Sequence, residues 1–154
     1  MILGHKQASG KIIEFPRRVK MHASMHTDLI NKHIWLFWHR DVVVDFIQAG
    51  DQHITKRLSS DGVSLLVSFI YGSCDAQRRE VVWSELNMFD PGNQPWVVGG
   101  DFNIVSHPNK NKGRCVFPRR ASLSFAKFMV GKGLLDLGYS GDPITWCNNR
   151  KGDS

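Results

Sequence analysis

The chain has 154 residues, a formal net charge of +6 and a hydrophobic fraction of 42%. This length suits one domain with a core of its own, and the composition excludes a disordered tail or a coiled coil. No apolar run reaches the roughly 18 residues of a membrane span, and the first residues lack a secretory signal. We therefore expect an intracellular protein that is not secreted and has no membrane partner.

The positive charge is concentrated at the start of the chain. Residues 1–40 carry seven Lys and Arg against two acidic side chains, a net charge of +5, whereas residues 41–154 carry +1. Such a segment either attracts phosphate groups or is a solvated, poorly ordered arm. We interpret residues 1–33 as a basic leader and residues 34–154 as the folded part.

Cysteine and histidine spacing gives no metal or disulfide pattern. The three cysteines, Cys74, Cys115 and Cys147, form no C-x-x-C pair, which argues against a disulfide framework and a zinc knuckle and fits a reducing compartment. His22 and His26 have helical spacing, but no Cys, Asp or Glu set completes a zinc site.

Short apolar runs separated by turn residues predict strands over 34–38, 42–47, 54–58 and 64–71. The run at 64–71 (SLLVSFIY) is too apolar for a half-exposed strand, so we expect it to be buried. The residues before it, SSDG at 59–62, predict a turn. Because no helix interrupts these strands, we expect an antiparallel or mixed sheet. The aromatic residues of the first run are expected in the core: Trp35, Phe37 and Trp38.

A helix is predicted next, with Asp75 as its N-terminal cap and Pro91–Gly92 as its end. Four of its apolar residues share one stripe. They are Val81, Val82, Leu86 and Phe89.

Another buried strand is predicted over 96–98, and a second helix from about residue 121 to residue 135. Leu123, Phe128 and Met129 are expected on the buried face of that helix. Strands that alternate with helices in a mixed sheet indicate an α/β layered domain.

The strongest local signal for a functional site is the string WVVGGDFN at 96–103. A buried strand ends in two glycines, and Asp101 and Asn103 follow two positions apart, which in a strand points both side chains to one face. Glycine lets a backbone or a phosphate approach closely, and ligands of α/β sheets gather at the carboxyl ends of strands. The alternative is an ordinary turn, since Gly, Asp and Asn are common turn residues.

Three strings resemble the endonuclease/exonuclease/phosphatase family. They are FIYG at 69–72, GDFN at 100–103 and LLDLGYSGDPITWCNNR at 134–150, and NKHIWLFWHRDVVV at 31–44 adds to them. More narrowly, they are similar to the apurinic-type endonuclease domain of plant non-LTR (LINE-like) retrotransposon polyproteins. The resemblance covers roughly residues 31–150 and implies a four-layer α/β sandwich, here incomplete.

The resemblance implies Mg²⁺- or Mn²⁺-dependent hydrolysis of DNA phosphodiester bonds, and a DNA substrate in turn implies the nucleus. By its motifs, Asp101 matches the aspartate that orients or deprotonates the attacking water and is a candidate metal ligand. Asn103 matches the asparagine that holds Asp101 and the phosphate, and Tyr71 matches a tyrosine that contacts the scissile phosphate. Thr145 and Trp146 match a structural Thr-Trp segment.

Two parts of the family pattern have no convincing match. Glu14 is the only glutamate before residue 80, but its context does not fit the metal-binding glutamate. The terminal aspartate and Ser-Asp-His motif of the family are also missing. We therefore expect a domain truncated at both ends, with cleavage weakened or lost. The alternative is a non-catalytic nucleic-acid-binding remnant of a retrotransposon protein.

Five basic residues follow GDFN within eleven positions. If this loop borders the site, it attracts the nucleic-acid backbone; otherwise it is an ordinary solvated loop. The five are Lys110, Lys112, Arg114, Arg119 and Arg120.

Overall fold

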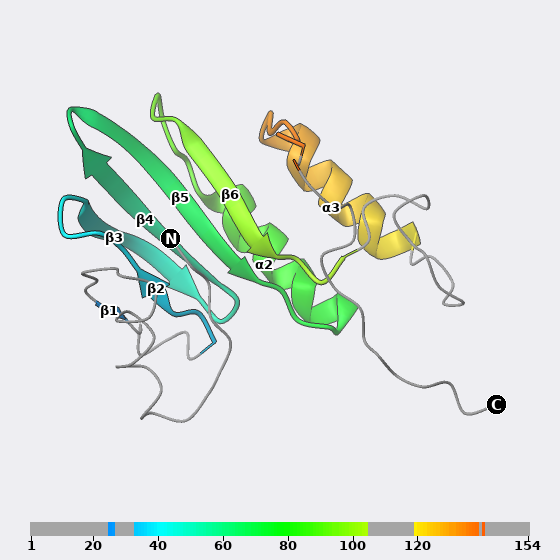
Figure 1. Ribbon diagram of the computed structural model, residues 1–154. Coiled ribbons are helices and arrows are strands. Elements are labelled where there is room, and N and C mark those ends of the chain that lie inside the picture. The colour runs from blue at the N-terminus through cyan, green and yellow to red at the C-terminus, as the bar shows by residue number, and fades with distance from the viewer. Residues whose placement is uncertain (1–24, 27–32, 105–118, 139, 141–154) are drawn as a thin grey trace.

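The computed structural model of the chain describes residues 25–26, 33–104, 119–138 and 140 (Figure 1). Most of the basic leader expected over residues 1–33 lies outside these ranges. The strands and helices are β1 (Met25–His26), β2 (Leu36–Phe37), β3 (Val43–Gly50), β4 (His53–Ser60), β5 (Val63–Tyr71), α2 (Ala76–Met88), β6 (Trp96–Asp101) and α3 (Arg119–Gly131).

The main sheet has four strands in the order β3-β4-β5-β6. The first three are antiparallel, and β6 pairs with β5 in parallel after the chain has passed through α2. This is the mixed sheet that the sequence predicts, and with two helices it places the chain in the α/β class. A short antiparallel pair, β1–β2, accompanies it.

The predicted turn at 59–62 is a tight hairpin between β4 and β5. Asp61 and Gly62 have positive φ angles of 50° and 78°. An Asp-Gly pair tolerates this left-handed conformation, which matches the twist of the two strands. The turn therefore fixes the register that pairs Ser60 with Val63.

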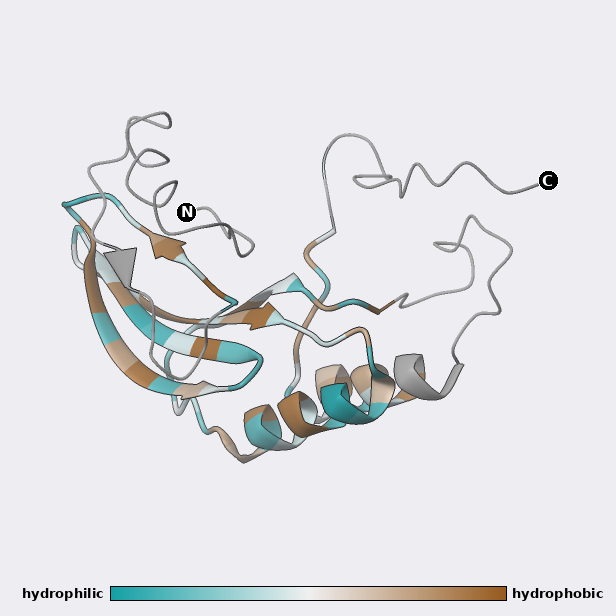
Figure 2. Ribbon diagram, turned by 90° about the horizontal axis from the view of Figure 1, so that it is seen from below, coloured by the Kyte–Doolittle hydropathy of each residue, from teal (hydrophilic) through white to brown (hydrophobic). Residues whose placement is uncertain are grey.

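Strand β5 is buried on both faces, as its continuous apolar run predicts. On one face, Val67 and Phe69 pack with residues of β4 and of the segment around β2. On the other face, Ile70 packs against α2 and α3. Figure 2 shows both helices along this second face of the sheet. The aromatic residues expected in the core are there: Trp35 and Phe37 are buried, and Trp38 packs at the edge of the first cluster.

Helix α2 begins at the predicted cap, where the Asp75 carboxylate accepts a hydrogen bond of 2.9 Å from the Arg78 backbone N–H. Its buried stripe differs from the prediction. Val82 and Leu86 are buried, but Val81 is 51% exposed and Trp83 is buried instead. Val81 and Trp83 each point about 100° away from Val82, on opposite sides of it. Which of the two is buried therefore depends on how the helix packs against the sheet.

Helix α3 ends earlier than predicted, at Gly131. The Leu134 N–H donates to the Met129 carbonyl at 2.9 Å, and the Gly133 N–H donates to the Val130 carbonyl at 3.1 Å. With Gly133 at φ 62°, this is a Schellman ending. Phe128 is buried as predicted, whereas Leu123 is 56% exposed and lies off the packed face. In the described part of the chain, no helix is long and apolar enough to cross a membrane.

Candidate functional site

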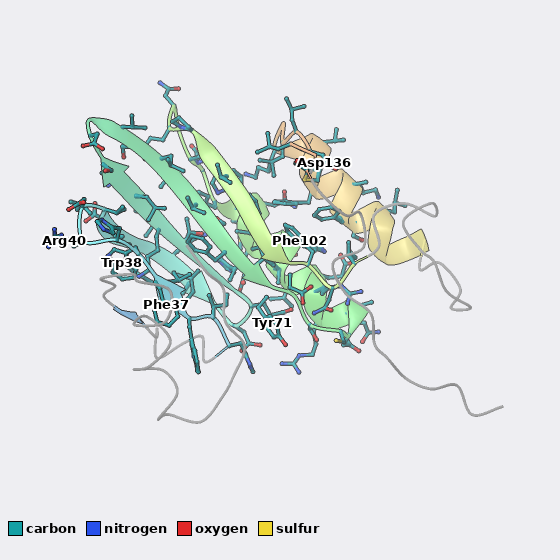
Figure 3. The ribbon with its side chains drawn as sticks, viewed as in Figure 1. Phe37, Trp38, Arg40, Tyr71, Phe102 and Asp136 are labelled. Carbon is teal, nitrogen blue, oxygen red and sulfur yellow. The ribbon has the colours of Figure 1, made fainter. Side chains whose placement is uncertain are left out.

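The candidate site lies where the parallel strands β5 and β6 end together. Tyr71 is the last residue of β5, Asp101 is the last residue of β6, and the two are paired in the ladder. Figure 3 labels Tyr71 at this end of the sheet. Because the strands are parallel, their carboxyl ends meet at one edge, where ligands of α/β sheets gather.

Gly100 brings β6 close to β5. Its φ is 140°, and a Cβ at this position would collide with the carbonyl oxygen of Ile70. A Cβ at Gly99 would have nothing within 4 Å. Of the two glycines in the motif, Gly100 is therefore the one that the close approach requires.

A turn, rather than strand alternation, brings Asp101 and Asn103 together. The strand ends at Asp101, so the expectation of one strand face is wrong for Asn103. Asn103 instead has φ 47°, and its backbone N–H donates to Asp101 Oδ1 at 3.0 Å. Both side chains are exposed at this strand end. Asparagine is among the few residues that accept this conformation readily.

Two cross-strand hydrogen bonds tie this turn to the end of β5. The Gly72 N–H donates to the Asp101 carbonyl at 2.7 Å, and Asn103 Nδ2 donates to the Gly72 carbonyl at 2.7 Å. A Cβ at Gly72 would lie 2.6 Å from the Phe102 carbonyl oxygen, so the close contact requires glycine. We call Tyr71, Asp101 and Asn103 together the strand-end corner.

Two buried polar side chains support the loop after Tyr71, and neither carried a signal in the sequence. Gln52 Oε1 accepts from the Ser73 N–H at 2.6 Å, and Gln52 Nε2 donates to the Arg78 carbonyl at 2.7 Å. Arg79 is 4% exposed and its guanidinium donates to the Ser73 carbonyl. The loop that leaves the corner is therefore held from the β3–β4 turn and from α2.

His33 is a further neighbour of the corner that the sequence did not indicate. Its ring and the ring of Tyr71 are stacked, with centroids 5.5 Å apart and planes 23° from parallel. The two residues are distant in sequence, so no local pattern marks the contact.

The Tyr71 phenol remains protonated near neutral pH. Burial raises the pKa of Tyr71 above 10.0, and the nearby Asp101 carboxylate and Cys74 add to the rise. A protonated phenol has an O–H donor for a phosphate oxygen.

The described residues do not complete a magnesium site. No three His, Cys, Asp or Glu side chains within the described ranges are grouped as metal ligands. The corner supplies one carboxylate, Asp101, and Mg²⁺ commonly takes one or two carboxylates together with substrate phosphates and water, so its other ligands would have to come from outside the corner. Glu14, the weak glutamate candidate, lies outside the described residues.

The other expected residues are only partly described. Arg119 and Arg120 form the first positions of α3. Outside the described residues lie Lys110, Lys112, Arg114, Thr145 and Trp146.

A groove of about 590 Å³ lies between β6 and α3, and none of the three residues of the strand-end corner lines it. It is lined mainly by apolar side chains, among them Trp96, Phe102, Phe125 and Met129. The labels of Figure 3 show Phe102 on this side of β6, toward α3.

Comparisons with known proteins do not identify a family for this chain. No protein-family model matches the chain, and no curated protein matches its sequence at a significant level.

Proposed function

We propose that this chain is an endonuclease/exonuclease/phosphatase-type domain of the retroelement class that cleaves DNA phosphodiester bonds. The observation that carries the proposal is the strand-end corner, in which Tyr71 and Asp101 are paired and Asn103 contacts both strand ends. The four-layer sandwich, the Mg²⁺ or Mn²⁺ requirement and a nuclear location belong to the same proposal and rest on the resemblance of the motifs.

Each residue of the corner has a role that its position supports. Asp101 is exposed and accepts one hydrogen bond from Asn103, so the remaining lone pairs of its carboxylate can orient or deprotonate a water. Asn103 Nδ2 carries two hydrogens, and the contact with Gly72 uses one of them. Tyr71 donates a hydrogen bond from its phenol to a phosphate oxygen. As the water oxygen bonds to phosphorus, its proton passes to the Asp101 carboxylate, the P–O bond to the leaving oxygen breaks, and the leaving oxygen takes up a proton from solvent.

A divalent metal would offset the negative charge that develops on the phosphate. The described residues do not complete its site, so no step of the proposed reaction is assigned to it. With one carboxylate in the corner, we expect slow cleavage.

Nicking of supercoiled plasmid DNA tests the proposal. We expect relaxed circles with Mg²⁺ or Mn²⁺, none with EDTA, and a loss of about 100-fold or more in Asp101→Ala, as is typical when a general base is removed. Asp90→Ala is the matched control, because the Asp90 carboxylate accepts a similar turn hydrogen bond, from the Gly92 N–H at 2.8 Å, on the loop before β6. Equal rates in both variants would contradict a role of Asp101.

A non-catalytic nucleic-acid-binding protein is the second candidate. It is favoured by the finding that the described residues group no three metal-ligating side chains. A gel-shift titration with the same DNA in EDTA separates the two candidates. Binding by the folded chain, together with no nicking in Mg²⁺ or Mn²⁺, would establish the second.

A further inference from the structure

We propose that His33 is a positioning residue of the strand-end corner, whose stacked ring holds the Tyr71 phenol beside Asp101. This inference rests on the proposed function, in which Tyr71 contacts the phosphate. It assigns a task to a residue just before β2 to which the resemblance gives no role.

The geometry indicates that the face of the His33 ring is the part that contacts Tyr71. With planes 23° from parallel and centroids 5.5 Å apart, the two rings are stacked with an offset, a contact between ring faces. Tyr71 is half-buried and His33 is exposed, so the stack covers one side of the phenol from the solvent side. A tyrosine ring has two free torsions, and a ring stacked on one side removes orientations that point the hydroxyl away.

The contact from His33 differs in kind from the hydrogen bonds of the corner described above, which act on the backbone. Gln52, Gly72 and Asn103 hold the main chain around Tyr71, from residue 71 to residue 73, whereas His33 contacts the Tyr71 ring itself. Tyr71 and Asp101 are paired in the β5–β6 ladder, and the Asp101 carboxylate contributes to the raised pKa of Tyr71.

Three variants in the nicking assay test the inference. His33→Ala should lower kcat/KM about two- to tenfold, the range that loss of one aromatic stack corresponds to. His33→Phe keeps a flat ring and should stay within about twofold of the parent. His39→Ala is the control, because His39 is also an exposed histidine and pairs with Asp41 at 2.9 Å, away from the corner.

A second measurement does not require cleavage. The chain has two tyrosines, so Tyr139→Phe leaves Tyr71 as the only phenol to titrate by ultraviolet absorbance. Burial is the largest cause of its raised pKa. His33→Ala in this background should therefore lower the pKa of Tyr71 toward 10, and His33→Phe should not.

The outcomes separate the two proposals. If the parent does not nick DNA, the proposed function fails. The tyrosine titration still shows whether the His33 ring covers Tyr71. The inference is overturned if His33→Ala leaves both the nicking rate and the Tyr71 titration unchanged. It is also overturned if His33→Phe is as impaired as His33→Ala, because the ring face would then not be what matters.

Discussion

The strand-end corner and the His53–Glu85 pair are two polar groups of this sheet with opposite surroundings. In the corner, Asp101 and Asn103 are exposed, and the hydrogen bonds that hold them are made largely by the backbone. His53 is 2% exposed between β4 and α2, with Nδ1 3.3 Å from Glu85 Oε2 but in no hydrogen bond of good geometry. The comparison teaches that the corner can offer its polar atoms to a ligand, whereas the buried His53 affects mainly stability.

The largest loss of stability should come from Gly100→Ala, because this substitution disrupts the backbone of the corner. A Cβ would collide with the Ile70 carbonyl oxygen at a φ that suits glycine, so we expect a loss of about 3 kcal/mol in the free energy of unfolding. Denaturant unfolding measures it. Gly99→Ala is the control, with no atom within 4 Å of its Cβ. Equal losses in the two variants would mean that the close approach of β6 to β5 is not what Gly100 provides.

A smaller effect is expected from Arg79→Met, which removes a buried support of the corner. The guanidinium donates to the Ser73 carbonyl, so we expect a loss of about 1–2 kcal/mol in unfolding free energy and slower nicking. Arg78→Met is the matched control, because Arg78 forms an exposed pair with Asp51 of the kind that contributes little. A nicking rate unchanged in Arg79→Met would show that the loop does not depend on this bond.

The smallest expected effect is a pH dependence of the unfolding free energy, caused by the buried His53. Burial lowers the pKa of His53 below its usual 6.5, so the unfolded chain binds more protons just below that pH. The unfolding free energy should therefore fall as the pH falls below about 6.5. His53→Gln should flatten this slope, and the exposed His39→Gln should not.

Glu85 on α2 faces His53, and its pKa is shifted as well. This shift changes stability with pH in the opposite direction. Burial, with a smaller contribution from Asp51, raises the pKa of Glu85 above 4.5. Between 4.5 and its folded-state pKa, the folded chain binds the extra proton, so stability falls as the pH rises. A slope below pH 6.5 that survives in His53→Gln would mean that a group other than His53 causes it.

Local patterns in the sequence predicted most of the sheet, but the expectation of a buried strand over 96–98 is wrong, because β6 is only partly covered and Val97 is 40% exposed. The apolar run of β5, the Asp-Gly turn and the Asp75 cap are each determined by neighbours within a few positions, and all three are confirmed. The burial of Trp83 in place of Val81 was not predictable in this way, because it depends on the rotation of α2 against the sheet.

The candidate site was only partly predictable for the same reason. The motif placed Asp101 and Asn103 together, although a turn rather than a strand achieves it. Gln52, Arg79 and His33 are contributed by other segments, and their contacts with the loop and with Tyr71 leave no periodic pattern in the sequence.

The shape of the corner depends on main-chain bonds, whereas its chemistry depends on side chains. The ladder between β5 and β6 and the bond from the Gly72 N–H to the Asp101 carbonyl use main-chain atoms. Replacing the Tyr71 or Asp101 side chain leaves those atoms in place. A variant of this chain that has lost the side chains of the corner can therefore still keep the same backbone architecture at the end of β5 and β6.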